Sequence, residues 1–100
     1  MAHYADTSNY SAGELELWEL LKAHENQSFQ TSRGLEFTYT IKGNEFFVDR
    51  KVKSITRATV NRAYQKAVEL KVVTGPKKLQ IFGASYLYPV FLEIGICTKE

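Results

Sequence analysis

Cysteine, histidine and proline are scarce in this sequence of 100 residues. The single cysteine, Cys97, has no second thiol with which to form an intrachain disulfide or complete a Cys-rich metal site. The two histidines, His3 and His24, do not form a metal-ligand cluster. These shortages exclude a small fold that is held together by disulfide bonds, and no cofactor or metal is expected.

Long apolar runs are also missing, since none approaches the roughly 18 residues of a membrane-spanning helix. The start, MAHYADTSNY, has neither the basic region nor the apolar stretch of a signal peptide. We therefore expect a cytoplasmic protein that does not contact a membrane. Residues 1–10 are polar and aperiodic, which predicts a flexible arm, and residues 11–100 are expected to form one domain. Because a chain this short buries a modest share of its surface, a homodimer is kept open.

Catalytic motifs are absent too. The sequence has no glycine-rich phosphate loop, and no serine or cysteine nucleophile with a histidine in a structured neighbour. Glu36, Glu45 and Asp49 near Lys51 are the residue types of a carboxylate-and-lysine nuclease site. However, no Asp/Glu-x-Lys triplet follows a suitable acidic partner in a clear strand context. The sequence predicts no enzyme and no catalytic residue.

Helical periodicity first occurs in SAGELELWELLKAHENQ. Ser11 and Glu14 have the spacing of a capping box, in which each side chain accepts a backbone N–H of the other residue. Leucines recur at helical spacing after them, and Trp18 widens their apolar face. The pattern predicts an N-terminal helix with Trp18 in the core.

The periodicity changes to alternation in LEFTYTIKGNEFFVDRK. Apolar residues beginning with Leu35 alternate with polar ones, which places one face of a strand on the core and the other in water. Gly43 and Asn44 both tolerate a positive φ, so residues 42–45 are expected to form a turn. The sequence therefore predicts a β-hairpin, with a short connection at residues 28–34 before it.

Charge is distributed unevenly, although the net charge is only +2. Residues 50–78 contain nine cations and one acid, a net charge of +8, whereas the other 71 residues carry −6. A basic block beside an acidic remainder is typical of a surface that binds phosphates, and is also compatible with an ordinary solvated face. Both interpretations stay open.

The basic block includes a second expected helix, residues 54–70, with Ser54 or Thr56 as its N-cap. Apolar residues at helical spacing, including Val60 and Ala63, predict one face that packs on the core.

The other face of this helix is expected to be exposed and to carry Arg57, Asn61 and Gln65 at spacings of i, i+4 and i+8. Arg, Asn and Gln side chains form paired hydrogen bonds with guanine or adenine edges in the major groove. Arg62 and Lys66, beside them, are placed to reach phosphates. An amphipathic helix with a basic wet face is the alternative.

The stretch TRATVNRAYQKAVELKVVTG resembles the recognition helix and following strand of winged helix-turn-helix regulators. The matching residues are Thr56, Arg57, Thr59, Val60, Ala63 and Leu70. The resemblance implies that the cap and the first exposed turns enter the major groove, with DNA contacts from Thr56, Arg57, Thr59, Asn61 and Arg62.

The same resemblance implies a wing, formed by strands at residues 72–74 and 79–82, with Lys77 and Lys78 on a phosphate. Where that family has a helix just before the recognition helix, this sequence has the hairpin. The order of FTYTIKGNE, KSITRATVNRAY, GPKKL and FGASYLYPVFLEIGI is also similar to short uncharacterised bacterial proteins. That similarity implies no activity.

The C-terminal stretch, QIFGASYLYPVFLEIGICTKE, is dense in apolar residues. Ser85 is a candidate N-cap, and Pro89 comes early enough to be tolerated near the first turn of a helix. Gly95 followed by Ile96 suits a glycine C-cap with an apolar contact. These signals predict a third helix at residues 85–94.

Together the patterns predict an α+β domain with an N-terminal helix, a β-hairpin, a central basic helix, a short wing-like hairpin and a C-terminal helix. We expect a small nucleic-acid-binding protein, regulator-like, whose partner is double-stranded DNA. The alternative is a protein-interaction module or inhibitor of an unidentified protein, with the basic face structural or partner-binding. The expected nucleic-acid contacts are Arg50, Lys51, Lys53, Thr56, Arg57, Thr59, Asn61, Arg62, Gln65, Lys66, Lys77 and Lys78.

Overall fold

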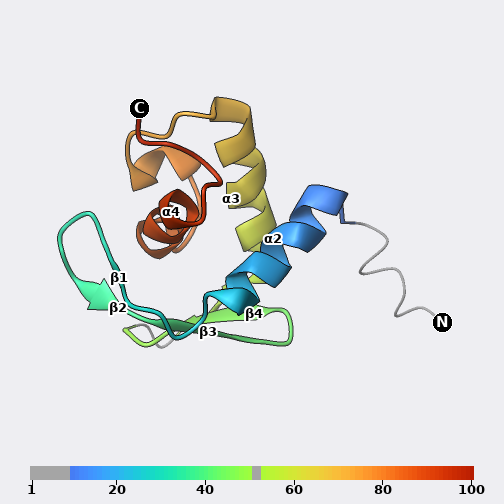
Figure 1. Ribbon diagram of the computed structural model, residues 1–100, viewed down its shortest axis with the longest axis vertical. Helices are drawn as coiled ribbons and strands as arrows, with labels where there is room; N and C mark the ends of the chain where they lie inside the picture. The colour runs from blue at the N-terminus through green and yellow to red at the C-terminus, as the bar shows by residue number, and fades with distance from the viewer. Residues whose placement is uncertain (1–9, 51–52) are drawn as a thin grey trace.

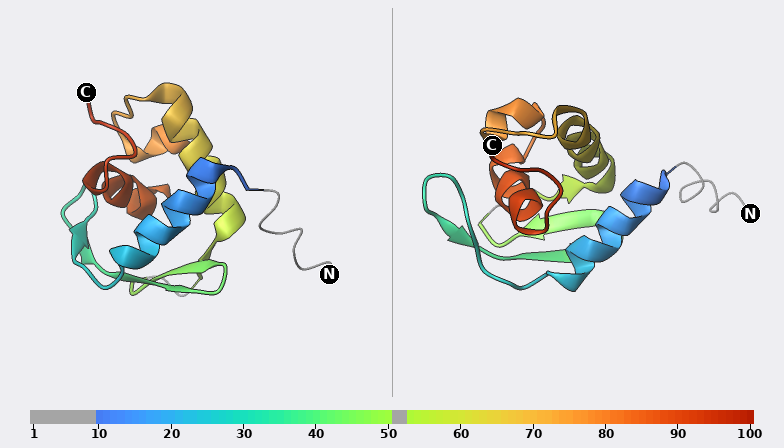
Figure 2. Two further views of the ribbon diagram at one scale, coloured as in Figure 1. Left: turned by 45° about the vertical axis from the view of Figure 1, so that its right-hand side comes forward. Right: turned by 45° about the horizontal axis from the view of Figure 1, so that its top comes forward.

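The computed structural model describes residues 10–50 and 53–100. Within them the chain forms three α-helices, a short 3-10 helix and two small antiparallel sheets, which is the α+β class that the sequence predicts. The elements are α2 (Ala12–Ala23), β1 (Phe29–Gln30), β2 (Glu36–Phe37), β3 (Tyr39–Lys42), β4 (Glu45–Val48), β5 (Ile55–Thr56), α3 (Arg57–Leu70), η1 (Pro76–Leu79) and α4 (Ala84–Glu93). The helices gather on one side of the strands (Figures 1 and 2).

The hairpin is confirmed. Strands β3 and β4 are antiparallel, with Lys42 opposite Glu45, and Gly43 has the positive φ, 59°, that the tight turn needs. Two strands were not predicted. The short β5 adds to β4 to give a sheet of order β3-β4-β5, and β1 pairs with β2 in a sheet of its own. Both are two-residue strands, too short for alternation to show in the sequence.

One hydrophobic core joins the helices to both sheets. Trp18 is 1% exposed, which confirms its place in the core. Leu35, expected on the same face as Phe37, is instead 48% exposed. The reason is local: Leu35 lies in the turn between β1 and β2, where its C=O accepts the Thr31 N–H at 2.9 Å.

The predicted capping box begins α2. The Ser11 hydroxyl accepts the Glu14 N–H at 3.1 Å, and the Glu14 carboxylate accepts the Ser11 N–H at 3.0 Å. Residues 1–9 of the expected arm lie outside the described residues. Tyr10, the last residue of that segment, is half-buried.

The wing expected at residues 72–82 is not formed. Val72 instead makes a parallel bridge with Thr98, and Val73 donates its N–H to the Thr98 C=O at 2.8 Å. The Gly-Pro-Lys-Lys stretch enters the 3-10 helix η1, not a hairpin turn. Proline fits the first position of a helix because its φ is already helical. In addition, Thr98 of the C-terminal segment takes the backbone pairing with Val72 that a second wing strand would need.

Helix α4 lies within one residue of the expected range, but Ser85 is not its cap. Gly83 occupies that position with φ 81°, a left-handed conformation that glycine adopts without strain. The expected C-terminal motif is confirmed, because the Ile96 N–H reaches the Phe91 C=O at 2.8 Å and the Gly95 N–H reaches the Leu92 C=O at 3.3 Å. None of the helices in residues 10–50 and 53–100 has the length and hydropathy to cross a bilayer.

Candidate nucleic-acid interface

The start of α3 is built as the sequence predicts, with Thr56 as the N-cap. Its hydroxyl accepts the Thr59 N–H at 3.2 Å and donates to the Thr59 hydroxyl at 3.0 Å. Ser54, the other candidate, donates its hydroxyl to Glu45 on β4. The Thr56 hydroxyl therefore satisfies a backbone N–H at the start of the helix, as an N-cap does.

Arg57, the first residue of α3, is enclosed by side chains from three other segments. Its guanidinium carbon lies 4.4 Å from the centre of the Tyr10 ring and 4.8 Å from that of Trp18. The Nη1 atom donates to the Asn44 Oδ1 at 3.1 Å, whereas the buried Nε has no hydrogen-bond partner among the described residues. Arg57 therefore ties α3 to α2 and to the hairpin turn.

Asn61 and Gln65 continue along the same face of α3. Asn61 is only 6% exposed, and its buried Oδ1 has no hydrogen-bond partner in the described part of the chain. The Gln65 side chain donates to the Glu14 carboxylate of α2. The expectation of an open outer face is wrong for Arg57, which lies against Trp18 of α2, and for Asn61, which is buried. It is confirmed for Gln65, which is exposed although its amide donates to Glu14.

Two of the predicted contacts from the β4–β5 connection, Arg50 and Lys53, are exposed. Arg50 donates its Nε to the Glu36 C=O at 2.7 Å. The Lys53 ammonium lies 5.5 Å from the centre of the Phe82 ring. Lys51 lies outside the described residues.

Four other predicted contacts face a different part of the molecule. They are Arg62 and Lys66 on α3 and Lys77 and Lys78 on η1. All but Lys66 are exposed, and Lys66 is half-buried with its ammonium 3.8 Å from the Glu69 carboxylate. Contacts between α3 and η1 bring these two basic segments together. Lys78 is the one of the four that lines neither of the two hollows described next.

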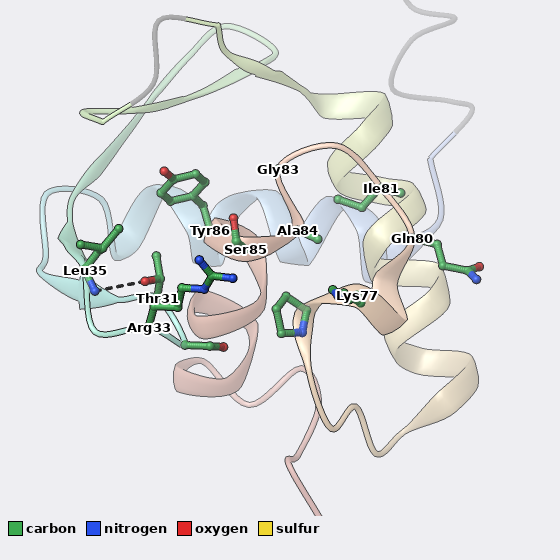
Figure 3. A pocket seen from close by; sticks show the side chains of 12 residues that line it. Thr31, Arg33, Leu35, Lys77, Gln80, Ile81, Gly83, Ala84, Ser85 and Tyr86 are labelled. Carbon is green, nitrogen blue, oxygen red and sulfur yellow. Dashed lines mark hydrogen bonds between the residues drawn. The ribbon is translucent and has the colours of Figure 1, made fainter.

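The larger hollow, about 610 Å³ in volume, lies between the β1–β2 turn, η1 and the start of α4. Figure 3 shows Arg33 extending from the turn on one side and Lys77 on η1 at the other. The Ser85 hydroxyl and the apolar side chains of Leu35 and Ile81 line the space between them. Within the described part of the chain, no Asp or Glu lines it.

A smaller hollow of about 240 Å³ lies between α3 and η1, where Arg62, Lys66 and the predicted contact Gln65 line it together with Glu69. Gln80 and Ile81 line both hollows, so the two adjoin across the end of η1. We call the joined pair the basic groove. Its cations are Arg33 and Lys77 in the larger hollow and Arg62 and Lys66 in the smaller.

Sequence reasoning missed Arg33 and Gln80. Arg33 is an isolated cation in a turn, well outside the basic block, and nothing near it in the sequence indicates a partner. Gln80 has the left-handed φ of 57° that ends η1, a conformation uncommon for a residue with a side chain. Only the fold places Arg33 across the hollow from Lys77.

Residues 10–50 and 53–100 contain no group of three or more His, Cys, Asp or Glu side chains that could hold an ion. Comparison with protein-family models, curated proteins and solved structures gave no match to this chain.

Proposed function

We propose that the protein binds nucleic acid and that the phosphate backbone lies along the basic groove. The observation that carries the proposal is that the two hollows share Gln80 and Ile81 as lining residues and therefore adjoin. Arg33 and Lys77 line one of them and Arg62 and Lys66 the other, and Glu69, the one acid among the described residues that lines the groove, is already paired with Lys66. A concave track with one dominant sign of charge concentrates anions and accelerates their association.

We propose that the protein contacts the phosphate backbone of the nucleic acid and that α3 does not read the edges of the bases. The three side chains suited to base edges, Arg57, Asn61 and Gln65, are stacked, buried or hydrogen-bonded to α2. Lysine and arginine on a groove supply charge to phosphates, which positions the protein but carries no sequence information. Binding is therefore expected to tolerate any sequence and to weaken as salt rises.

Fluorescence anisotropy with labelled oligonucleotides over a range of salt concentrations tests the proposal. Arg62→Ala and Lys77→Ala should each weaken binding about three- to tenfold and should lower the slope of log affinity against log salt by about 1. Lys42→Ala is the matched control, since Lys42 is exposed on the β3–β4 turn and does not line the groove. It should leave both quantities nearly unchanged.

Three results would contradict the proposal: no binding to DNA or RNA at low salt, binding that does not respond to salt, or equal losses in the Lys42 control. A preference for one duplex sequence that Arg57→Ala removes would instead establish base reading by α3. The native protein and each variant should first show the same cooperative unfolding, so that lost affinity is not lost structure.

We also propose a second function, binding to a protein partner or to another copy of the chain. It is supported by Val68, Leu70 and Val72, which are 46%, 37% and 45% exposed at the end of α3 and just beyond it. Apolar side chains gathered on a surface mark interaction sites when they form a continuous patch. A complex that survives nuclease treatment, with a mass above that of the monomer, would support this function. A monomer with no captured partner would contradict it.

A further inference from the structure

We propose that the larger hollow of the basic groove takes one unpaired nucleotide of a single strand, with a phosphate between Arg33 and Lys77. The inference rests on the proposed function and specifies the form of nucleic acid that binds. It predicts a preference for single strands over duplexes.

The size and lining of the hollow fit a nucleotide. Its volume of about 610 Å³ lies within the range of roughly 300–1,000 Å³ typical of small-molecule sites. A nucleotide combines an anionic phosphate, a polar sugar and a flat base. The lining offers the counterparts: two cations, the hydroxyls of Thr31 and Ser85, and apolar surface.

The two cations approach the hollow from opposite walls. Arg33 belongs to the β1–β2 turn and Lys77 to η1, so a phosphate placed between them would meet positive charge from both sides (Figure 3). Since no acid among the described residues lines the hollow, no lining carboxylate would repel that phosphate. The guanidinium of Arg33 is also planar, and such planes stack on unpaired bases.

The apolar part of the lining explains why a base, and not a phosphate alone, is the expected occupant. Leu35 is 48% exposed, and Ile81 and Pro76 are only half-buried. A base that covers these side chains removes apolar surface from water, which a bare anion cannot do. In a duplex the bases are paired and stacked inside, whereas a single strand can turn a base outward into such a hollow.

Hydrogen bonds and packing hold the walls of the hollow in place without a ligand. Thr31 closes the β1–β2 turn by three hydrogen bonds: its N–H to the Leu35 C=O at 2.9 Å, its hydroxyl from the Leu35 N–H at 3.1 Å, and its C=O from the Gly34 N–H at 2.9 Å. On the other side, Gly83 at the start of α4 packs closely on the buried Ile55. A preformed site loses little conformational entropy when a ligand enters, which favours binding.

The first test compares affinities for a single strand and for a duplex of the same length. The native protein should favour the single strand about tenfold, which is the order of effect expected from stacking and burial of one base. Ser85→Trp, at an exposed position, should fill the hollow and reduce this preference to near equality, with salt-dependent binding to the duplex retained. Leu35→Ser, which removes apolar lining but leaves the backbone bonds of the turn, should reduce it several-fold.

Ala23→Trp is the matched control, because it adds the same indole at an exposed site at the end of α2, outside the hollow. The inference is overturned if the native protein binds both forms equally, or if Ser85→Trp and Leu35→Ser both keep the native preference. In that case, salt-dependent binding would still support the proposed function. Absence of salt-dependent binding to either form would contradict the proposed function and this inference together.

The second test uses amide chemical shifts in NMR spectra with uridine monophosphate, uridine and inorganic phosphate as separate probes. The nucleotide should shift the amides of residues 31–35 and 83–86 more than either of the other probes. Shifts that are absent, or equally large with phosphate alone, would contradict a nucleotide site. A mononucleotide that binds as tightly as the oligonucleotide would also overturn the inference, because the ligand would then be a free nucleotide.

Discussion

The guanidinium of Arg57 lies over the ring of Trp18, with its central carbon 4.8 Å from the centre of that ring. The same carbon is 4.4 Å from the centre of the Tyr10 ring. A cation over an aromatic face contributes about 0.5–2 kcal/mol, so Arg57→Ala should lower the free energy of unfolding by about 1–3 kcal/mol. Arg57→Lys should recover only part of this, because an ammonium cannot stack as a planar group. Urea unfolding followed by the fluorescence of Trp18 measures both.

Arg62→Ala is the control for this stability effect, since Arg62 is exposed on the same helix. Its unfolding free energy should change by less than about 0.5 kcal/mol. If Arg57→Ala were as stable as the native protein, the stacked guanidinium would not hold α3 to α2, and the predicted recognition role of Arg57 would regain its basis.

The polar column of α3 shows where sequence patterns stop being informative. A hydrophobic pattern distinguishes apolar from polar faces, and it placed Val60 and Ala63 in the core correctly. It cannot show that another helix will cover the polar face. Arg57 and Gln65 meet matching groups on α2, an element distant in the sequence, and Asn61 is buried as well.

Glu14 is the second residue that joins α2 to α3, and it leads to a second prediction. Its carboxylate accepts both the Ser11 N–H and a hydrogen bond from Gln65, and the residue is 6% exposed. Glu14→Ala should therefore cost about 1–3 kcal/mol of stability, because it removes half of the capping box and leaves the Gln65 amide without its acceptor. Thermal or urea unfolding would measure this loss.

Glu16 provides the comparison for Glu14, since it lies in the same helix but is exposed. Glu16→Ala should change stability by less than about 0.5 kcal/mol. Gln65→Ala should be milder than Glu14→Ala, because the cap at Ser11 survives. Equal effects of the two glutamate substitutions would show that the hydrogen bonds of Glu14 contribute nothing specific.

Two glycines with nearly the same backbone conformation give a third prediction. Gly83 has φ 81° and Gly95 has φ 85°, so alanine is strained at either position. A Cβ at Gly95 would meet no heavy atom within 4 Å, whereas one at Gly83 would collide with the side chain of the buried Ile55. Gly95→Ala should therefore cost about 1 kcal/mol, and Gly83→Ala about 2–4 kcal/mol from strain and overpacking combined.

The two glycines also allow a test of whether the contact with Ile55 causes the larger loss at Gly83. Ile55→Val shortens the side chain that the new methyl would strike, so in that background the additional loss from Gly83→Ala should shrink, while the loss from Gly95→Ala stays the same. Identical losses at the two glycines in the native background would mean that the contact with Ile55 is not close enough to matter.

The features that sequence predicts well in this protein depend on residues only a few positions apart. The Ser11–Glu14 capping box, the turn at Gly43, the Thr56 cap and the Gly95–Ile96 helix end are all of this kind. The basic groove is different, because it requires the β1–β2 turn to lie beside η1. Arg33 and Lys77 come to line one hollow only in the folded chain, so charge counted along the sequence found Lys77 and missed Arg33.

Two buried tyrosines determine how stability should depend on alkaline pH. The Tyr39 hydroxyl donates to the Leu21 C=O at 2.7 Å, and the Tyr88 hydroxyl donates to the Val73 C=O at 2.6 Å. Burial raises the pKa of both above its ordinary value, with further contributions from the charge of Glu25 near Tyr39 and from Cys97 near Tyr88. Burial also raises the pKa of Cys97 itself.

Groups whose pKa is higher in the folded state hold their protons more tightly there than in the unfolded chain. The stability from these tyrosines is thus fully present below the unfolded pKa of about 10 and declines as the pH rises above it. Each tyrosine that stays protonated only when folded should contribute a slope of about 1.4 kcal/mol per pH unit, and Cys97 should add a decline that begins at lower pH. Urea unfolding between about pH 8 and pH 11 would measure the slopes.

Phenylalanine variants identify the groups responsible for that decline. Tyr88→Phe should remove one tyrosine's share of the slope above about pH 10, although its stability at neutral pH should fall by about 1 kcal/mol because the Val73 C=O loses a donor. Tyr39→Phe should act in the same way through the Leu21 C=O. Tyr10→Phe is the control, since no hydrogen bond is found for the Tyr10 hydroxyl among the described residues, and it should leave the slope unchanged. If neither core variant flattens the alkaline decline, the two buried hydroxyls do not cause it.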